Sequence, residues 1–502
     1  MAVSIETLEE VHPEYKDLQP LWEEVDAYYR GWPTVAPYLH RHQRETDLAY
    51  GYRLTRAYYR NYIKPIVQLW VAYVFKPGVD RDPGSIEQLI DLWGNCDRKG
   101  SQMTSYMKRS TVGSNTLGDC ITLVDFAKPD RKIRNKADQR EQRAYPYCVK
   151  YRADQLTNWE VDELGELVWC RLKEDYPTGL GPFQDRLGRK ITRYRTWDRE
   201  QWWIHDVVED GRGKKRIERP ERHTGKHKLG EVPVVIHYGE MDEDEGKLRG
   251  FPPIMDMGRI NRAIFSWCSI LDESLHQHGI PLLTMQEEED EDQPDEIVSG
   301  VHNVVTYAKG NNKPEFLDRP TASLEHMSNT IEVEKEEIYR MAHFGGNQFA
   351  TRPTTVPSGV ALAWMFSDTN QLLAYIAKQA QDTELRIKHF FAKWLGKEDD
   401  GSIKYPSKFG IDDLEAELNR VLGIQNTLRS ETAKREAEKR YIRKEFAELE
   451  PDVIETMERE TDDTDLSVSG QKELLDLLSG KQQTAQSPEV EEPEGAEEEE
   501  AA

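Results

Sequence analysis

Histidine pairs are the first residues whose type and spacing could support chemistry. They occur as His40 with His42, His223 with His227, and His276 with His278. Zinc sites need three or four protein ligands, and no further ligand is spaced near any pair. GxxxxGK[ST], GxGxxG, HExxH and GxSxG motifs are also absent from the sequence. The sequence therefore predicts a protein that is not an enzyme, with no catalytic residue, no cofactor and no metal site.

A run of acids could support calcium binding or docking. It consists of Glu287, Glu288, Glu289, Asp290, Glu291 and Asp292. The run lacks the glycine and the spaced ligands of an EF-hand loop, which argues against calcium. It is interpreted either as a solvated loop or as a docking surface for a basic partner.

Two basic stretches could neutralise phosphates, at residues 128–143 and 212–228. A charged hairpin tip is more often solvated, or paired with acids on a neighbouring subunit. The role of the basic hairpin at 212–228 stays open at this point.

The formal charge of the 502 residues is −25, and the excess is localised. Residues 287–296 contribute −8 and residues 395–502 contribute −16, which leaves the rest close to neutral. No uncharged apolar stretch approaches the roughly 20 residues of a membrane helix. The five cysteines, an odd number without CxxC spacing, predict a reducing compartment and no disulfide framework. The first 20 residues lack the apolar run of a signal peptide.

Hydrophobic periodicity predicts an α+β fold. Apolar residues at helical spacing predict one helix over residues 43–76 and shorter helices near 85–93 and 101–110. Alternation with a period of two then predicts an antiparallel sheet, with Asp210 and Gly211 as a hairpin signal. Its strands are expected near residues 145–151, 164–172, 190–197, 201–208 and 232–238.

The region from residue 250 to 394 has an unusual predicted order. A helix over residues 257–278 is followed by a small insertion with strands near 280–285 and 303–308, and then by a second helix with Ser323 as its N-cap. A loop rich in glycine and proline, 343–359, leads into a long helix over 360–394. Loops of this length between helices are uncommon and are often functional.

This order resembles the portal proteins of tailed bacteriophages. The resemblance is carried by GFPPIMDMGRINRAIF at 250–265, IEVEKEEIYRMAHFGG at 331–346, PSGVALAWMF at 357–366, YYRNYIKPIVQLWVAYVFKP at 58–77 and SNTLGDCITLVDF at 114–126. These motifs are loose, so the likeness is one of architecture over most of the chain.

The resemblance implies a mainly helical α+β portal architecture with a β-rich wing, two stem helices, a small α/β clip and a helical crown. The implied division is a wing at 1–250, stem helices at 251–279 and 319–342 around a clip at 280–318, a tunnel loop at 343–359, a long wing helix at 360–400, a crown at 401–480 and a disordered acidic tail at 481–502.

The implied function is a ring, expected to be a dodecamer, at one capsid vertex of a virion and made in the host cytoplasm. Double-stranded DNA would pass through it without sequence specificity during packaging and ejection. Terminase and a head-tail adaptor would dock at the clip acids, and major capsid and scaffolding proteins would be further partners, with no membrane involved. The residues expected to face DNA in the tunnel loop are Asn347, Gln348, Thr351, Arg352, Thr354 and Thr355.

Two alternatives stay open from the sequence. An acidic helical scaffold or adaptor protein would differ from a portal only in its geometry. A nucleic-acid-processing enzyme is less favoured, because it would need clustered carboxylates or a phosphate loop.

Overall fold

The structure is a computed structural model of the whole chain, which divides into two compact units, Met1–Phe409 and Gly410–Ala502. It describes residues 3–126, 144–176, 190–210, 212–219, 223–241, 247–279, 283–286, 304–307, 321–343 and 359–409, and seven helical residues between 435 and 459. All elements below belong to the first unit. The regions expected to form a crown and an acidic tail lie almost entirely outside the described residues.

Helices dominate the N-terminal part of the first unit. Two of them begin at side-chain caps: the Ser4 hydroxyl accepts a hydrogen bond from the Thr7 amide, and the Thr46 hydroxyl accepts one from the Ala49 amide, both at 3.2 Å. The elements are α1 (Ile5–Glu9), α2 (Pro13–Arg30), the 3-10 turn η1 (Ala36–Tyr38), α3 (Asp47–Arg56), α4 (Ile63–Phe75), α5 (Gln88–Gly94) and α6 (Met103–Leu117).

The single helix predicted over residues 43–76 is wrong, because the chain breaks between α3 and α4. Pro65 explains part of the break: its ring would clash with the carbonyl of Asn61 in a continuous helix, whereas proline is tolerated in the first turn of α4. The Asn61 side chain instead accepts a hydrogen bond from the Lys64 amide at 2.9 Å, at the start of α4. Helix α4 keeps the predicted apolar spacing, with Ile66, Trp70 and Val74 buried, whereas the buried residue of α3 is Arg53.

A six-stranded antiparallel sheet contains the strands predicted near 164–172, 190–197 and 201–208. Its main path is β4-β5-β6-β7-β8, and β9 pairs with β7. The predicted turn at Asp210 is confirmed, since its carboxylate accepts hydrogen bonds from the amides of Arg212 and Lys214 at 2.9 Å. The strands are β4 (Leu156–Val161), β5 (Leu167–Tyr176), β6 (Lys190–Asp198), β7 (Gln201–Glu209), β8 (Lys215–Glu218) and β9 (Thr224–Lys226), with the 3-10 turn η2 (Ala153–Gln155) before them.

A second sheet has the antiparallel order β10-β2-β3, made by β2 (Asp119–Phe126), β3 (Pro146–Arg152) and β10 (Val234–Tyr238). The strands near 145–151 and 232–238 are thereby confirmed, whereas β2 was not predicted. The first six residues of β2 are all buried, so its sequence lacks the alternation of a half-exposed strand. Two short antiparallel pairs complete the sheets, β1 (Asp80–Asp82) with β15 (Ser402–Lys404) and β11 (Glu240–Met241) with β12 (Gly250–Phe251).

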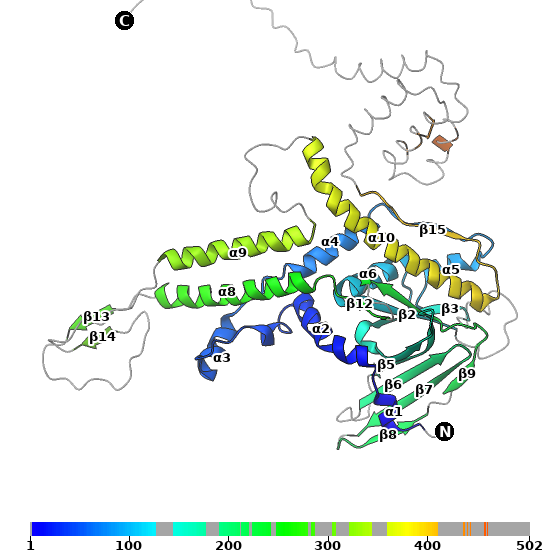
Figure 1. Cartoon of the computed structure of the whole chain (residues 1–502), viewed down its shortest axis with the longest axis horizontal. Helices are drawn as coiled ribbons and strands as arrows, with labels where there is room; N and C mark the ends of the chain where they lie inside the picture. The colour runs from blue at the N-terminus through cyan, green and yellow to red at the C-terminus, as the bar shows by residue number, and fades with distance from the viewer. Residues whose placement is uncertain are drawn as a thin grey trace, which may run out of the picture. The chain divides into compact units, whose positions relative to one another are not determined.

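Mixed helices and largely antiparallel sheets make the fold α+β, as predicted. The helices α8 (Met255–Gly279) and α9 (Thr321–Met341) lie side by side and extend away from the sheets, and β13 (Leu283–Gln286) and β14 (Val304–Tyr307) pair in parallel at their far end (Figure 1). We call these four elements the arm. The predicted cap at Ser323 is wrong, because α9 begins two residues earlier.

The long helix predicted over 360–394 is α10 (Gly359–Leu395), which packs on β2, β3, β10, α4 and α6 (Figure 1). Its inward face, including Ile376, Ile387 and Phe390, joins the main hydrophobic core. The Glu384 carboxylate, also buried in α10, accepts hydrogen bonds from Arg81 in β1 at 2.6 and 3.0 Å and from the Tyr405 hydroxyl at 2.5 Å. These contacts tie α10 to β1 and to the residue that follows β15.

A buried ion pair holds the chain just before the arm. The Arg249 guanidinium donates two hydrogen bonds to the Asp119 carboxylate in β2, at 2.7 and 2.8 Å, and both side chains are fully buried. Arg249 also donates to the carbonyls of Ala153 and Leu156 and lies between the rings of Trp22 and Trp159. The pair thus joins α2, both sheets and the segment leading into α8.

Gly118 makes a close approach at this junction. A Cβ there would lie 2.5 Å from the carbonyl oxygen of Gly250, and the backbone has a φ of +92°. Both facts require glycine, because other residues pay about 1–2 kcal/mol for that conformation even without a clash.

Candidate functional site

The base of the arm is fixed by a buried amide. The Asn261 side chain, in the first half of α8, accepts hydrogen bonds from the Tyr59 hydroxyl at 2.7 Å and the Tyr62 amide at 3.2 Å, and donates to the Arg60 carbonyl at 2.9 Å. Asn261 therefore satisfies the Tyr62 amide and the Arg60 carbonyl, which lie in the segment between α3 and α4. Burial raises the pKa of the Tyr59 phenol, so this contact stays a neutral hydrogen bond.

A second polar cluster joins the arm to the loop before α3. Arg53 pairs with Glu45 at 2.7 Å, donates to the His40 carbonyl at 2.7 Å, and reaches the Ser269 hydroxyl of α8 at 3.1 Å. The hydrogen bonds from Arg53 lower the pKa of Glu45 to about 2. This cluster holds the His40 segment against α8.

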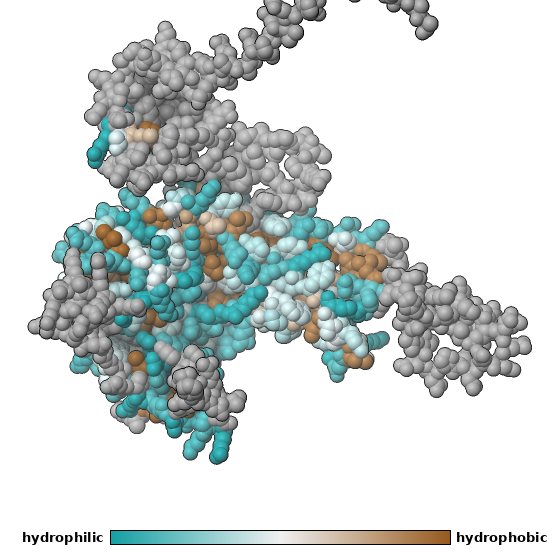
Figure 2. All heavy atoms as spheres, turned by 180° about the vertical axis from the view of Figure 1, so that it is seen from behind, coloured by the Kyte–Doolittle hydropathy of each residue, from teal (hydrophilic) through white to brown (hydrophobic). Residues whose placement is uncertain are grey.

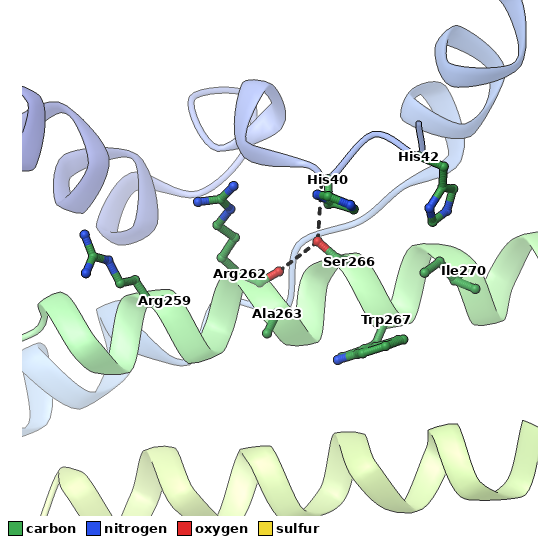
Figure 3. Close-up of a pocket in the computed structure, with 8 residues that line it drawn as sticks. All are labelled: His40, His42, Arg259, Arg262, Ala263, Ser266, Trp267 and Ile270. Carbon is green, nitrogen blue, oxygen red and sulfur yellow. Dashed lines mark hydrogen bonds between the residues drawn. The ribbon is translucent and has the colours of Figure 1, made fainter. Parts of the chain in front are cut away.

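A groove of about 580 Å³ opens between that segment and α8 (Figure 3). The His40 amide donates to the Ser266 hydroxyl at 3.5 Å, and Ser266 donates to the Arg262 carbonyl at 3.1 Å. The lining combines cationic or imidazole groups with apolar ones: His40, His42, Arg259, Arg262, Ala263, Ser266, Trp267 and Ile270.

The cations in this groove have no close ion pair among the described residues, although Arg262 donates a hydrogen bond to the Tyr38 carbonyl at 3.1 Å. Arg259 and Arg262 lie 3.4 and 3.8 Å from the Glu24 carboxylate, and their side chains are 55% and 41% exposed. Trp267, beside them, is 40% exposed. The groove therefore offers two accessible guanidinium groups next to an uncovered aromatic ring.

The outer face of α9 has the opposite character. Glu325, Asn329, Val333 and Glu336 follow at steps of four, four and three, which places them along one side of the helix. Val333 is 63% exposed. Among the described residues, Glu325 and Glu336 have no ion pair, whereas Glu332 and Glu337 pair with Lys335 and Arg340. We call this stripe the α9 ridge.

The residues predicted to contact DNA or docking partners all lie outside the described residues. They are Glu287, Glu288, Glu289, Asp290, Glu291 and Asp292 in the acidic run, and Asn347, Gln348, Thr351, Arg352, Thr354 and Thr355 in the loop. The structure describes the elements next to them. The acidic run follows β13 directly, and the loop residues lie between α9 and α10.

The histidine pairs take different places in the fold. His40 and His42 line the groove, with ring centroids 6.0 Å apart. His227 is buried, and its Nε2 lies 3.0 Å from the Asp198 carbonyl. Within the part of the chain that the structure describes, no group of three or more His, Cys, Asp or Glu residues could hold a metal ion. All five cysteines are free and buried.

Sequence reasoning missed the groove and the α9 ridge. The stripes themselves are visible in the sequence, as Arg259, Ala263, Trp267 and Ile270 repeat the same steps of four, four and three. Nothing in the sequence, however, places the His40 segment beside α8, since more than 200 residues separate them.

Comparisons with known proteins give distant structural similarity only. No protein-family model matches the sequence, and no curated protein matches it. A chain in the virion of a native gene transfer agent particle is similar with a TM-score of 0.38 and 11% identity, over 74% of this chain and 88% of that chain. A chain in the neck of the empty particle, computed with C6 symmetry, is similar with a TM-score of 0.40 and 11% identity, over 74% of this chain and 89% of that chain. At these values the similarity adds nothing to the functional argument, which rests on the geometry of the arm.

None of the helices in the described ranges combines the length and the apolar character needed to cross a membrane.

Proposed function

We propose that this chain is the subunit of a portal ring in a virion, through which double-stranded DNA is packaged and ejected. The observation that carries the proposal is the arm: two antiparallel helices that extend from an α+β body, end in a small strand pair and lead into a long helix over the sheets (Figure 1). This is the order expected of stem helices, clip and wing.

Exposed apolar side chains on the arm support assembly. Trp267, Leu275 and Val333 are 40%, 56% and 63% exposed in a single copy. On the reverse face, apolar residues lie among hydrophilic ones near the far end of the arm (Figure 2). Packing each arm between two neighbours would cover both sides, and a heterologous contact of this kind closes into a ring when the rotation fits. The expected ring is a dodecamer.

The charge distribution suits a DNA conduit. A channel that bound phosphates tightly would retain the DNA, because each contact gains free energy from counterion release. A body close to neutral, with −8 in residues 287–296 and −16 in residues 395–502, avoids such retention. We assign the acids at 287–292 to docking of the terminase and then of the head-tail adaptor, and the polar residues at 347–355 to passing contacts with DNA.

Negative-stain microscopy of the purified full chain tests the ring. Rings with a central hole are the expected result. Compact particles together with a monomer or dimer mass at every salt concentration would overturn the proposal, and would favour an acidic scaffold or adaptor protein.

Deletion of residues 347–353 tests the role of the tunnel loop. Rings should still form, because the arm is unchanged, while the amount of DNA packaged should fall. A deletion of equal length in the acidic tail, residues 490–496, provides the control. Packaging unchanged by the first deletion would remove the role assigned to the loop.

A further inference from the structure

Two surfaces of the arm match each other in residue spacing and in charge, although they cannot meet within one chain. The groove is lined by Arg259, Arg262, Trp267 and Ile270 of α8, and Arg262 points toward the side on which the His40 segment lies (Figure 3). The α9 ridge presents Val333 between Glu325 and Glu336, on the side of α9 away from its own buried residues Ile331 and Ile338.

The relative level of the two helices follows from Tyr62, which contacts both. Its amide donates to the Asn261 side chain of α8 at 3.2 Å, and its ring centroid lies 6.3 Å from that of Tyr339 in α9, so Asn261 and Tyr339 lie at about the same level of the arm. The helices are antiparallel and share the same rise per residue. Val333 therefore lies level with Trp267, and Glu336 lies level with Ile264, one turn or less from Arg262.

We propose that the groove of one copy receives the α9 ridge of the next copy, with Val333 against Trp267 and Glu336 beside Arg262. This inference rests on the proposed ring and names the contact that builds it. Copies related by a rotation about an axis along the arm keep residues of equal level opposite one another, which is the match that the two stripes require.

Charge chemistry favours a second copy as the occupant. The two guanidinium groups of the groove call for carboxylates, and the one carboxylate described near them, Glu24, lies at 3.4 Å or more, while Arg262 also donates to the Tyr38 carbonyl at 3.1 Å. The ridge offers two carboxylates without an ion pair among the described residues, and an exposed aliphatic side chain between them. Planar guanidinium groups are well suited to such carboxylate contacts at interfaces.

A charge swap tests the contact in the full chain. Arg262→Glu and Glu336→Arg alone should each raise the protein concentration needed for half-assembly into rings by tenfold or more, as measured by mass photometry. The double variant should recover assembly to within about threefold of wild type, because the pair is restored with reversed polarity. Glu163→Arg, an equal charge change on an exposed turn of the body, is the matched control and should leave assembly unchanged.

Crosslinking gives a second measurement that does not depend on assembly strength. With Ala263→Cys and Val333→Cys in one chain, a short bismaleimide should produce a ladder of dimers, trimers and larger species on a denaturing gel, while either single variant should not. Rings that form normally in both charge variants, with no ladder, would overturn this contact and leave the portal proposal standing. Absence of rings in the wild type would instead overturn the portal proposal itself.

Discussion

The junction before the arm buries its charged side chains, whereas the outer faces of the arm expose theirs. At the junction, Arg249 and Asp119 are fully buried, and the guanidinium is satisfied by the carboxylate and two carbonyls. On the arm, the side chains of Arg259 and Arg262 are 55% and 41% exposed, and Glu325 and Glu336 lack ion pairs among the described residues. The junction satisfies its charged groups within one chain, whereas the arm leaves charged groups accessible on two of its faces.

The arm itself divides its apolar residues between two faces. Ile331 and Ile338 of α9 join the main hydrophobic core, whereas Trp267, Leu275 and Val333 are exposed, as are some large apolar side chains of the body such as Leu48 and Leu164. Burying a side chain of this size stabilises a protein by about 1.5–3 kcal/mol. Burial of Trp267, Leu275 and Val333 against another copy would supply this stabilisation to an assembled ring.

Asp119→Ala should give the largest loss of monomer stability. Removing one partner of a buried pair leaves an unpaired charge, which costs about 3–5 kcal/mol. Chemical denaturation of the variant should show this loss directly. If Asp119→Ala yields no soluble protein, Asp119→Asn keeps the shape and should still lose stability.

The double variant Asp119→Ala with Arg249→Met provides the control. Because it removes both charges together, it should be more stable than Asp119→Ala alone. A loss under about 1 kcal/mol in the single variant would contradict the role assigned to the pair.

Buried His237 should make the free energy of unfolding depend on pH, with a smaller effect than the loss expected for Asp119→Ala. Complete burial lowers its pKa to about 3, and its Nδ1 lies 2.9 Å from the Ser110 hydroxyl. In the unfolded chain the pKa is about 6.5, so the unfolded state binds a proton first as pH falls. Stability is therefore retained above about pH 6.5 and is lost on acidification toward pH 3, by up to about 1.4 kcal/mol per pH unit.

His237→Gln isolates this contribution. Between pH 7 and pH 5, the wild type should lose about 2 kcal/mol more unfolding free energy than the variant. The comparison removes effects of other groups, including His205 and His227, whose pKa values are also lowered by burial. Equal losses in the two proteins would show that His237 is not kept neutral in the folded state.

The parts of the fold that could be predicted are those determined by residues close together in the sequence. The long helices and the alternating strands were predicted because one face of each is buried, which leaves a period in the sequence. The strand β2 was not predicted because both its faces are buried. The break before α4 was missed although Pro65 is a local signal for it, and the contacts that fix the broken segment come from Asn261, about 200 residues away. The α9 start was misplaced because a serine two residues inside the helix resembles a cap.

The candidate site was less predictable than the fold for the same reason. The spacing in α8 and α9 indicates helices, but their exposed stripes look like ordinary amphipathic patterns. The pairing of the His40 segment with α8 is set by Arg53, which reaches Glu45, the His40 carbonyl and Ser269 together. Such a three-way contact has no signature in the sequence.

Val333→Asp should have the smallest effect on the stability of the monomer. It therefore separates the role of the exposed arm from that of the body most sharply. An exposed helical residue away from partners changes stability by about 0.5 kcal/mol or less. Ile338→Asp, the matched control on the same helix, places a charge at a fully buried position and should lower stability by several times that amount. Thermal unfolding under conditions that keep the protein monomeric measures both.

If Val333→Asp abolishes rings while leaving monomer stability intact, the exposure of Val333 serves assembly. If it destabilises the monomer as much as Ile338→Asp, the ridge belongs to the interior of the single chain, and the contrast between body and arm fails.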